Sequence, residues 1–68
     1  MKVCWQLTAI GGEKEFRYFD GQDDWTLQEN ARVYHNKDEA RAKAYEIMPL
    51  LPVGCSDVMM EEVWCDEH

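Results

Sequence analysis

One complete helix is encoded by residues 36–49, NKDEARAKAYEIMP, and it decides the fold. Asn36 followed by Glu39 resembles a capping box, which satisfies the free amides at a helix start. The spacing predicts a helix from Lys37 to Met48, ended by Pro49, because proline lacks the amide hydrogen that a helix requires. One side of this helix should be buried against a sheet. The apolar stripe on that side comprises Ala40, Ala44, Ile47, Met48 and Leu51.

Two strands are predicted before the helix. Residues 2–10 alternate between apolar and mixed side chains, the pattern of a half-buried strand. Gly11 and Gly12 follow, and such a pair tolerates the positive φ angles of a two-residue hairpin turn. The return strand is expected over residues 13–19.

A polar loop, DGQDD at residues 20–24, begins the segment between this hairpin and the helix. Three Asp in five residues invite a calcium interpretation, but the loop lacks the alternating ligands and the closing Glu of a calcium-binding loop. A solvated turn is the favoured interpretation, because Asp and Gly favour turns for backbone reasons alone. Beyond the loop, Trp25 should pack on the core, and residues 29–31 favour a short helical turn.

The last predicted strand spans residues 57–65, and its side chains fall into two alternating sets. The more apolar set should face the helix; it comprises Val58, Met60, Glu62 and Trp64. The expected fold class is α+β, a small antiparallel sheet in the order ββαβ with one helix packed on one face, in a single domain over residues 1–68. The second face of the sheet and at least one edge should remain uncovered.

Size and composition exclude several classes of function. A chain of 68 residues buries only about 60% of its unfolded surface, which leaves little volume for an enzyme pocket. Neither histidine belongs to a nucleophile–base grouping, and no glycine-rich phosphate loop is present, so we expect no enzymatic activity and no cofactor. The sequence has no apolar run long enough to span a membrane and no signal-peptide pattern, which favours a cytoplasmic protein.

Charge is the most one-sided property of the chain. The net charge is −7, and residues 46–68 contain six carboxylates and no Lys or Arg, whereas the first 45 residues are close to neutral. Such a field repels nucleic acid, so direct nucleic-acid binding is not expected, and it attracts basic protein surfaces. A second interpretation is that these acids only keep a small protein soluble.

A partner-binding surface is predicted on the last strand and the first hairpin. Three Trp exceed what one helix can cover, so at least one should be exposed, and exposed Trp or Met among carboxylates would suit a basic protein. Self-association of two copies through the free sheet edge, giving a homodimer, is the alternative use of this region. The residues assigned to the surface are Glu61, Glu62, Asp57, Glu13 and Glu15 for charge, with Trp64 or Met59 as the apolar anchor.

The three cysteines, Cys4, Cys55 and Cys65, have no C-x-x-C spacing. Free thiols that pack as small apolar residues are the simplest interpretation in a reducing compartment. Two alternatives stay open. A disulfide between Cys4 and Cys65 requires the first and last strands to be neighbours. A zinc site that stabilises the small core would use Cys4, Cys55, Cys65 and His68.

Four short segments resemble a pattern common in small proteins of phages and prophages: RYFDG at 17–21, DWT at 24–26, NARVY at 30–34 and NKDEA at 36–40. In those proteins a hairpin is followed by a W-T turn, an A-R-V-Y/F segment and a helix that opens with K-[DE]-E-A. The resemblance covers residues 16–44. Some acidic phage proteins of this architecture are anti-CRISPRs or other inhibitors of host machinery. The resemblance therefore implies a protein that occludes a host protein or nucleoprotein complex.

Overall fold

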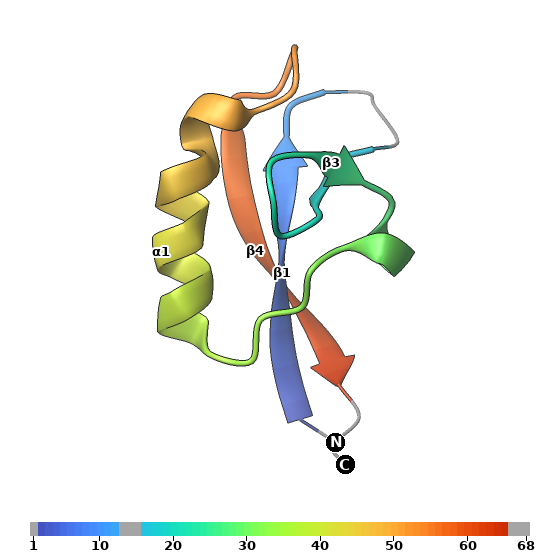
Figure 1. Ribbon diagram of the computed structural model, residues 1–68, viewed down its shortest axis with the longest axis vertical. Helices are drawn as coiled ribbons and strands as arrows, with labels where there is room; N and C mark the ends of the chain where they lie inside the picture. Colours follow the sequence, from blue (N-terminus) through green and yellow to red (C-terminus); the bar gives the residue numbers. More distant parts are fainter. Residues whose placement is uncertain (1, 13–15, 66–68) are drawn as a thin grey trace.

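The computed structural model describes residues 2–12 and 16–65. Two long strands, β1 (Lys2–Ile10) and β4 (Asp57–Cys65), cross the molecule, and helix α1 (Lys37–Ile47) lies along one side of them (Figure 1). Two short strands, β2 (Tyr18–Phe19) and β3 (Trp25–Thr26), complete an antiparallel sheet in the order β3-β2-β1-β4. The predicted α+β fold, with a small antiparallel sheet and one helix on one face, is confirmed.

The β1–β4 ladder is the backbone of the fold. It runs in register from Lys2 opposite Cys65 to Ile10 opposite Asp57, so both strands are paired over their whole length. The bounds of the last strand agree with those predicted from its alternation. Because β1 also pairs with β2 on its other side, β1 is central and β4 lies at the edge.

The hydrophobic core lies between the sheet and α1. Its buried members come from four different segments of the chain, and half-buried side chains including Trp5, Trp25, Val58 and Met60 pack against them. Burying side chains of this size contributes roughly 1.5–3 kcal/mol each. Because Val58 and Met60 pack against the core between the sheet and α1, the prediction that they face the helix is confirmed. The buried core residues are Leu7, Phe19, Tyr34, Ala40 and Ile47.

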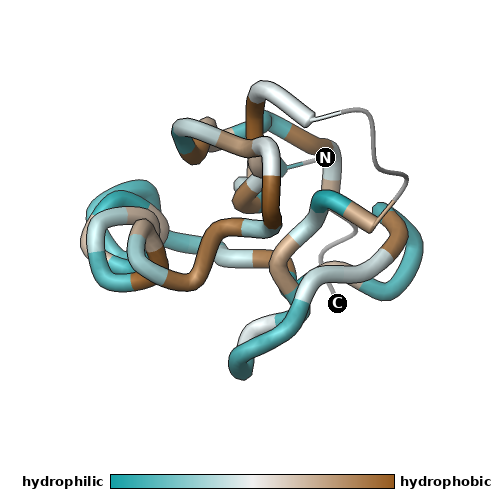
Figure 2. The backbone as a smooth tube through the Cα atoms, turned by 90° about the horizontal axis from the view of Figure 1, so that it is seen from above, coloured by the Kyte–Doolittle hydropathy of each residue, from teal (hydrophilic) through white to brown (hydrophobic). Residues whose placement is uncertain are grey.

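The helix begins where its cap predicts. Asn36 Oδ1 accepts hydrogen bonds from the backbone amides of Asp38, at 2.8 Å, and Glu39, at 3.1 Å. The helix ends at Ile47, one residue before the predicted end, because the chain tightens into the 3₁₀ turn η2 (Met48–Leu50), which contains a proline. Seen from above, the helix lies to one side of the sheet, and the side of the helix that faces away from the sheet is mostly hydrophilic (Figure 2).

The predicted two-residue hairpin turn is wrong. A turn at Gly11 and Gly12 would place Thr8 opposite residue 15, but Thr8 pairs with Tyr18. The glycines serve a long-range contact instead, since a Cβ at Gly12 would lie only 2.9 Å from the sulfur of Cys55. Residues 13–15 of the expected return strand lie outside the described residues. Of the remaining positions, residues 16 and 17 are not in a strand, and only Tyr18 and Phe19 form β2.

The loop after β2 is organised by one carboxylate. Asp20 Oδ1 accepts hydrogen bonds from the amides of Gln22, at 2.8 Å, and Asp24, at 3.3 Å, which closes the turn on itself. The chain then forms the 3₁₀ helix η1 (Gln28–Asn30), close to the helical turn expected at residues 29–31.

The second face of the sheet is covered over β1, contrary to the sequence prediction. Gln6 and Thr8 of this face are each only 5% exposed. The side-chain amide of Gln6 donates to the backbone carbonyl of Gln28 at 3.2 Å, and the side-chain amide of Gln28 donates to Gln6 Oε1 at 3.4 Å. The η1 segment thus lies against the outer face of β1, on the side away from α1 (Figure 1).

Candidate protein-binding edge and a cysteine–histidine cluster

The outer edge of β4 is the longest stretch of strand backbone without a partner strand among the described residues. This strand is nine residues long and lies at the end of the sheet order, and no strand within residues 2–12 and 16–65 pairs with its outer side. A long, unpaired edge is a template for another strand, because its amides and carbonyls lack protein partners.

The pairing of β1 establishes which groups face outward. Trp5 exchanges both backbone hydrogen bonds with Tyr34, at 2.9 and 2.8 Å, so its amide and carbonyl point away from β4. Hydrogen-bonded and non-hydrogen-bonded pairs alternate along an antiparallel ladder. Because Trp5 lies opposite Glu62, the amide and carbonyl of Glu62 point to the open edge. The same holds for every second residue: Val58, Met60 and Trp64.

One of these outward amides is already used. Asp57 Oδ1 accepts a hydrogen bond from the Val58 amide at 2.8 Å. The carboxylate of Asp57 therefore closes the first position of the edge. The amides available to an added strand are those of Met60, Glu62 and Trp64.

The predicted surface residues flank this edge on both faces. Glu61 is half-buried and Glu62 is exposed, and consecutive residues of a strand point to opposite faces, so the two carboxylates do not share one surface. The anchors are also divided: Met59 is 45% exposed on the face away from α1, and Trp64 is 71% exposed on the other. Glu13 and Glu15, also assigned to the surface, lie outside the described residues.

A groove between α1 and β4 runs beside the edge, and the sequence interpretation did not include it. Asp57 and Arg41 contribute to its lining, and the exposed ring of Tyr45 stands on its helix side. A second, smaller hollow is lined by Val3, Glu62, Val63 and Trp64. The signal for the groove was present in the sequence, because Arg41 and Tyr45 follow helical spacing along one border of the predicted buried stripe, to which Met48 belongs. Apolar lining residues of the groove are Ala44, Met48, Val58 and Met60.

Glu61 belongs to a polar cluster on the outer face of the sheet. Its Oε2 atom and the Oγ1 atom of Thr8 are buried and have no hydrogen-bond partner of good geometry within the described chain. The phenol of Tyr18 lies near both: its pKa is raised above the ordinary value by burial and, to a smaller extent, by the Glu61 carboxylate. Glu61 thus has a role within the fold, and Glu62 is the cleaner probe of the edge.

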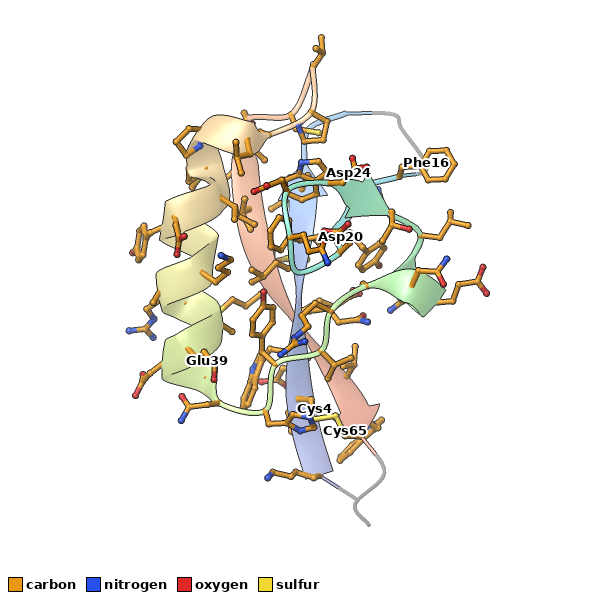
Figure 3. All side chains as sticks on the ribbon, viewed as in Figure 1. Cys4, Phe16, Asp20, Asp24, Glu39 and Cys65 are labelled. Atoms are coloured by element: carbon orange, nitrogen blue, oxygen red, sulfur yellow. A yellow bond between two sulfur atoms is a disulfide. The ribbon has the colours of Figure 1, made fainter. Side chains whose placement is uncertain are left out.

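The sulfur chemistry differs from the expected free thiols. Cys4 and Cys65 form a disulfide, with Cα atoms 5.9 Å apart, which corrects the free-thiol prediction for these two residues. They are diagonal neighbours in the ladder, since Cys4 lies opposite Val63. Figure 3 shows them at one end of the sheet, remote from the loop that contains Asp20 and Asp24.

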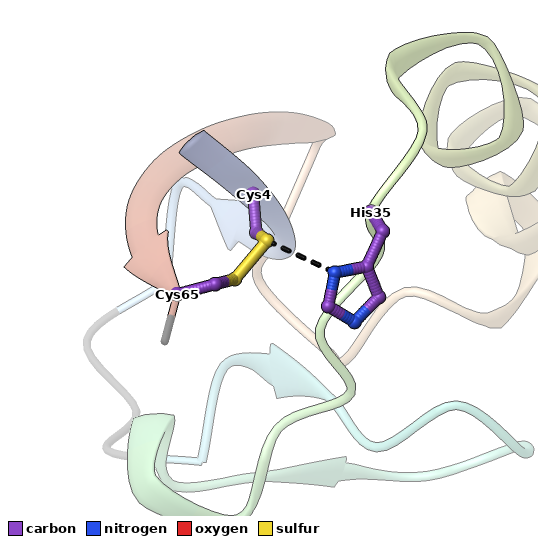
Figure 4. Close-up of a disulfide and its surroundings, with 3 residues drawn as sticks. All are labelled: Cys4, His35 and Cys65. Atoms are coloured by element: carbon purple, nitrogen blue, oxygen red, sulfur yellow. Dashed lines mark hydrogen bonds between the residues drawn. A yellow bond between two sulfur atoms is a disulfide. The ribbon is translucent and has the colours of Figure 1, made fainter. Parts of the chain in front are cut away.

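His35 completes a cluster at this end. Its Nδ1 atom lies 3.2 Å from the sulfur of Cys4 (Figure 4). Because a disulfide sulfur carries no hydrogen, the ring nitrogen is the donor in this contact. The position follows from strand pairing: Tyr34 is bridged to Trp5, so the next residue, His35, comes beside Cys4. Sequence reasoning missed His35, because the convergence depends on that register.

The predicted zinc set is therefore wrong in one member. Cys55 is a free cysteine in the loop before β4, at the opposite end of that strand from Cys65, and its sulfur packs near Gly12. It cannot join Cys4 and Cys65 without rebuilding the sheet. His68, the fourth predicted ligand, lies outside the described residues.

Comparison of the chain with protein-family models, with curated proteins and with solved structures finds no match. Within the part of the chain that the structure describes, no helix is both long and apolar enough to cross a membrane.

Proposed function

We propose that this chain is a small acidic binding protein that captures an extended basic segment of a partner along the open edge of β4. The partner is a host protein or nucleoprotein complex, which the bound protein inhibits or modulates by occlusion and without a catalytic step of its own. The observation that carries the proposal is a nine-residue edge that no other strand of the described residues pairs with, flanked by carboxylates.

Strand addition supplies both affinity and selectivity. Main-chain hydrogen bonds to the free amides of Met60, Glu62 and Trp64 provide affinity that depends little on the added sequence. Alternate side chains of the added strand would lie over the groove beside α1, whose lining includes Val58 and Tyr45. An apolar side chain suits that groove, whereas Lys or Arg suits positions beside the exposed carboxylates.

Charge favours a foreign partner over a second copy. Strands in a sheet lie about 4.8 Å apart, so two β4 strands paired edge to edge would bring the carboxylates of both copies together. No Lys or Arg occurs in residues 46–68 to offset them. Like charges on facing strands destabilise a pair, whereas a basic strand would gain from the same field.

The phage resemblance agrees with this mode of action. Protein surfaces that bind nucleic acid are positively charged, so they complement the negatively charged β4 edge. Covering such a surface is enough to inhibit it. The proposal places the protein in the cytoplasm of a bacterial host, as an inhibitor of the anti-CRISPR kind. It requires neither a membrane nor direct contact with nucleic acid.

A matched pair of substitutions at Glu62 tests the proposal. Glu62→Gln removes the charge and keeps the outward amide, whereas Glu62→Pro removes both; proline is tolerated at an edge position whose amide faces solvent. Tagged wild-type and variant proteins are used to capture partners from a bacterial lysate and eluted with rising salt. We expect the wild type to retain one basic protein or complex, Glu62→Gln to release it at lower salt, and Glu62→Pro to lose it.

The controls separate binding from folding. Urea unfolding monitored by Trp fluorescence must show that both Glu62 variants remain folded. Equal capture by Glu62→Pro and Glu62→Gln would overturn strand addition. If light scattering gives a stable dimer and the lysate yields no partner, the host-inhibitor proposal is wrong and self-association takes its place.

A further inference from the structure

The sulfur atoms of Cys4 and Cys65 and the Nδ1 atom of His35 form a ready set of metal ligands. These three atoms all lie within 4.8 Å of one another. Thiolate sulfur and imidazole nitrogen are the ligands that Zn²⁺ prefers, and they bind it at about 2.3 and 2.0–2.1 Å. Tetrahedral bonding then needs the two sulfurs about 3.8 Å apart, so they must move apart by about 1.8 Å from a disulfide once it is reduced.

The three ligands are held by the fold and do not depend on one flexible loop. Cys4 is fully buried in β1, and Cys65 ends β4. His35 is fixed on both sides, because Tyr34 before it is bridged to β1 and Asn36 after it caps α1. This convergence of three segments distinguishes the cluster from cysteines that are merely close in sequence.

We propose that the reduced protein binds Zn²⁺, or a similar thiophilic divalent ion, through the thiolates of Cys4 and Cys65 and Nδ1 of His35. A dithiol reductant supplies two electrons and two protons to the disulfide and is itself oxidised to a disulfide. Binding of Zn²⁺ then displaces the two thiol protons. Among the described residues the site has three protein ligands, which leaves a fourth position for water or an external ligand.

The site offers two ways to join the first and last strands. Under oxidising conditions the covalent bond joins them, and in a reducing compartment the metal does so with the help of His35. The consequence is that the end of β4 next to Trp64 stays attached to β1 in both states. This inference is independent of the proposed partner, since it concerns only the chain and an ion.

Cobalt binding tests the site directly, because tetrahedral Co²⁺ with thiolate ligands absorbs in the visible and near-ultraviolet range. The full chain is reduced with a phosphine, the phosphine is removed under anaerobic conditions, and Co²⁺ is titrated in and then displaced with Zn²⁺. We expect one equivalent of Co²⁺ with thiolate charge-transfer bands, displaced by Zn²⁺, and no such bands with the oxidised protein.

Three variants locate the ligands. Cys55→Ser is the matched control, because Cys55 lies at the far end of the sheet, and it should bind Co²⁺ like the wild type. Cys65→Ser should lose the charge-transfer bands. His35→Ala removes an exposed ring whose hydrogen bond within the fold is to the Cys4 sulfur. We expect it to weaken binding by at least about 10–100-fold, because removing even an outer-shell partner of a metal ligand costs that much.

Each contrary result overturns the proposal. Less than about a tenth of an equivalent of Co²⁺ on the reduced wild type, with circular dichroism showing that it is folded, excludes the site. Loss of binding in Cys55→Ser would assign the metal elsewhere. Unchanged affinity in His35→Ala would remove His35 from the ligand set, and that variant reports on the site even if Cys65→Ser fails to fold.

Discussion

Breaking the Cys4–Cys65 disulfide should remove a large part of the protein's stability. The bond joins residues separated by 61 positions, so it closes nearly the whole chain into one loop. The loop-entropy relation gives about 4 kcal/mol for a loop of this length, because the cross-link restricts the unfolded chain. A domain of this size has roughly 3–10 kcal/mol in total, so the reduced and metal-free protein should be marginally stable.

The assay compares the same chain in two states. Oxidised and phosphine-reduced proteins are unfolded in urea, both with a chelator present so that no metal replaces the bond, and Trp fluorescence reports the transition. The reduced protein should lose about 4 kcal/mol, equivalent to a fall in melting temperature of roughly 16–32 °C. Cys55→Ser, measured in the oxidised state, is the control. Its free energy of unfolding should stay within about 1 kcal/mol of the wild-type value.

A difference below about 1 kcal/mol between the two states would refute the reasoning. It would mean that the unfolded chain is already restricted without the bond, or that the two strand ends are not joined in the folded protein. Mass determination after thiol alkylation distinguishes these explanations, because a disulfide protects Cys4 and Cys65 and leaves Cys55 to react.

Three further outcomes are expected. Asn36→Ala removes the acceptor for two helix amides and should cost about 1 kcal/mol in urea unfolding, whereas an unchanged midpoint would show that the cap does not contribute. Phe19→Ala should cost about 3–5 kcal/mol, because this ring is fully buried and packs edge-on against Trp25, and a loss below about 1 kcal/mol would contradict the core assignment. Tyr18 and Tyr34 have pKa values raised mainly by burial, so the folded state favours the neutral phenol; stability should be intact below about pH 10 and fall as the pH rises above it. Tyrosinate absorbance measured against pH follows the titration of the phenols. A free energy of unfolding that stays constant as the pH rises through that range would contradict the expectation.

Local signals in the sequence predicted the helix and the long strands well. The Asn36 cap and the apolar spacing after it depend on neighbours within a few positions, and they place the helix start correctly. The alternation in residues 57–65 likewise reproduces the bounds of β4. It also assigns Trp64 to the set facing the helix, but this indole lies beyond the contact with α1 and is 71% exposed. Such patterns are predictable because each residue's environment repeats with the period of the element.

Contacts between distant segments could not be predicted in the same way. The glycines at 11 and 12 have the composition of a hairpin turn, yet they serve the close approach of the loop that contains Cys55. The covering of the outer face depends on Gln6 and Gln28, which lie 22 positions apart. The same limit explains why His35 was missed. Its approach to the sulfurs depends on strand register, and register is a property of the assembled sheet.

The disulfide also changes what a break in the chain means for this protein. Because the bond joins β1 to β4, every peptide bond from residue 4 to residue 65 lies inside one covalent ring. A protease that cuts the exposed turn at residues 22–24 opens the ring without dividing the molecule. The two pieces stay tethered at the strands that form the long ladder, and they separate on a denaturing gel only after reduction. The chain could likewise be opened by design within that turn, because the disulfide would still bond β1 to β4.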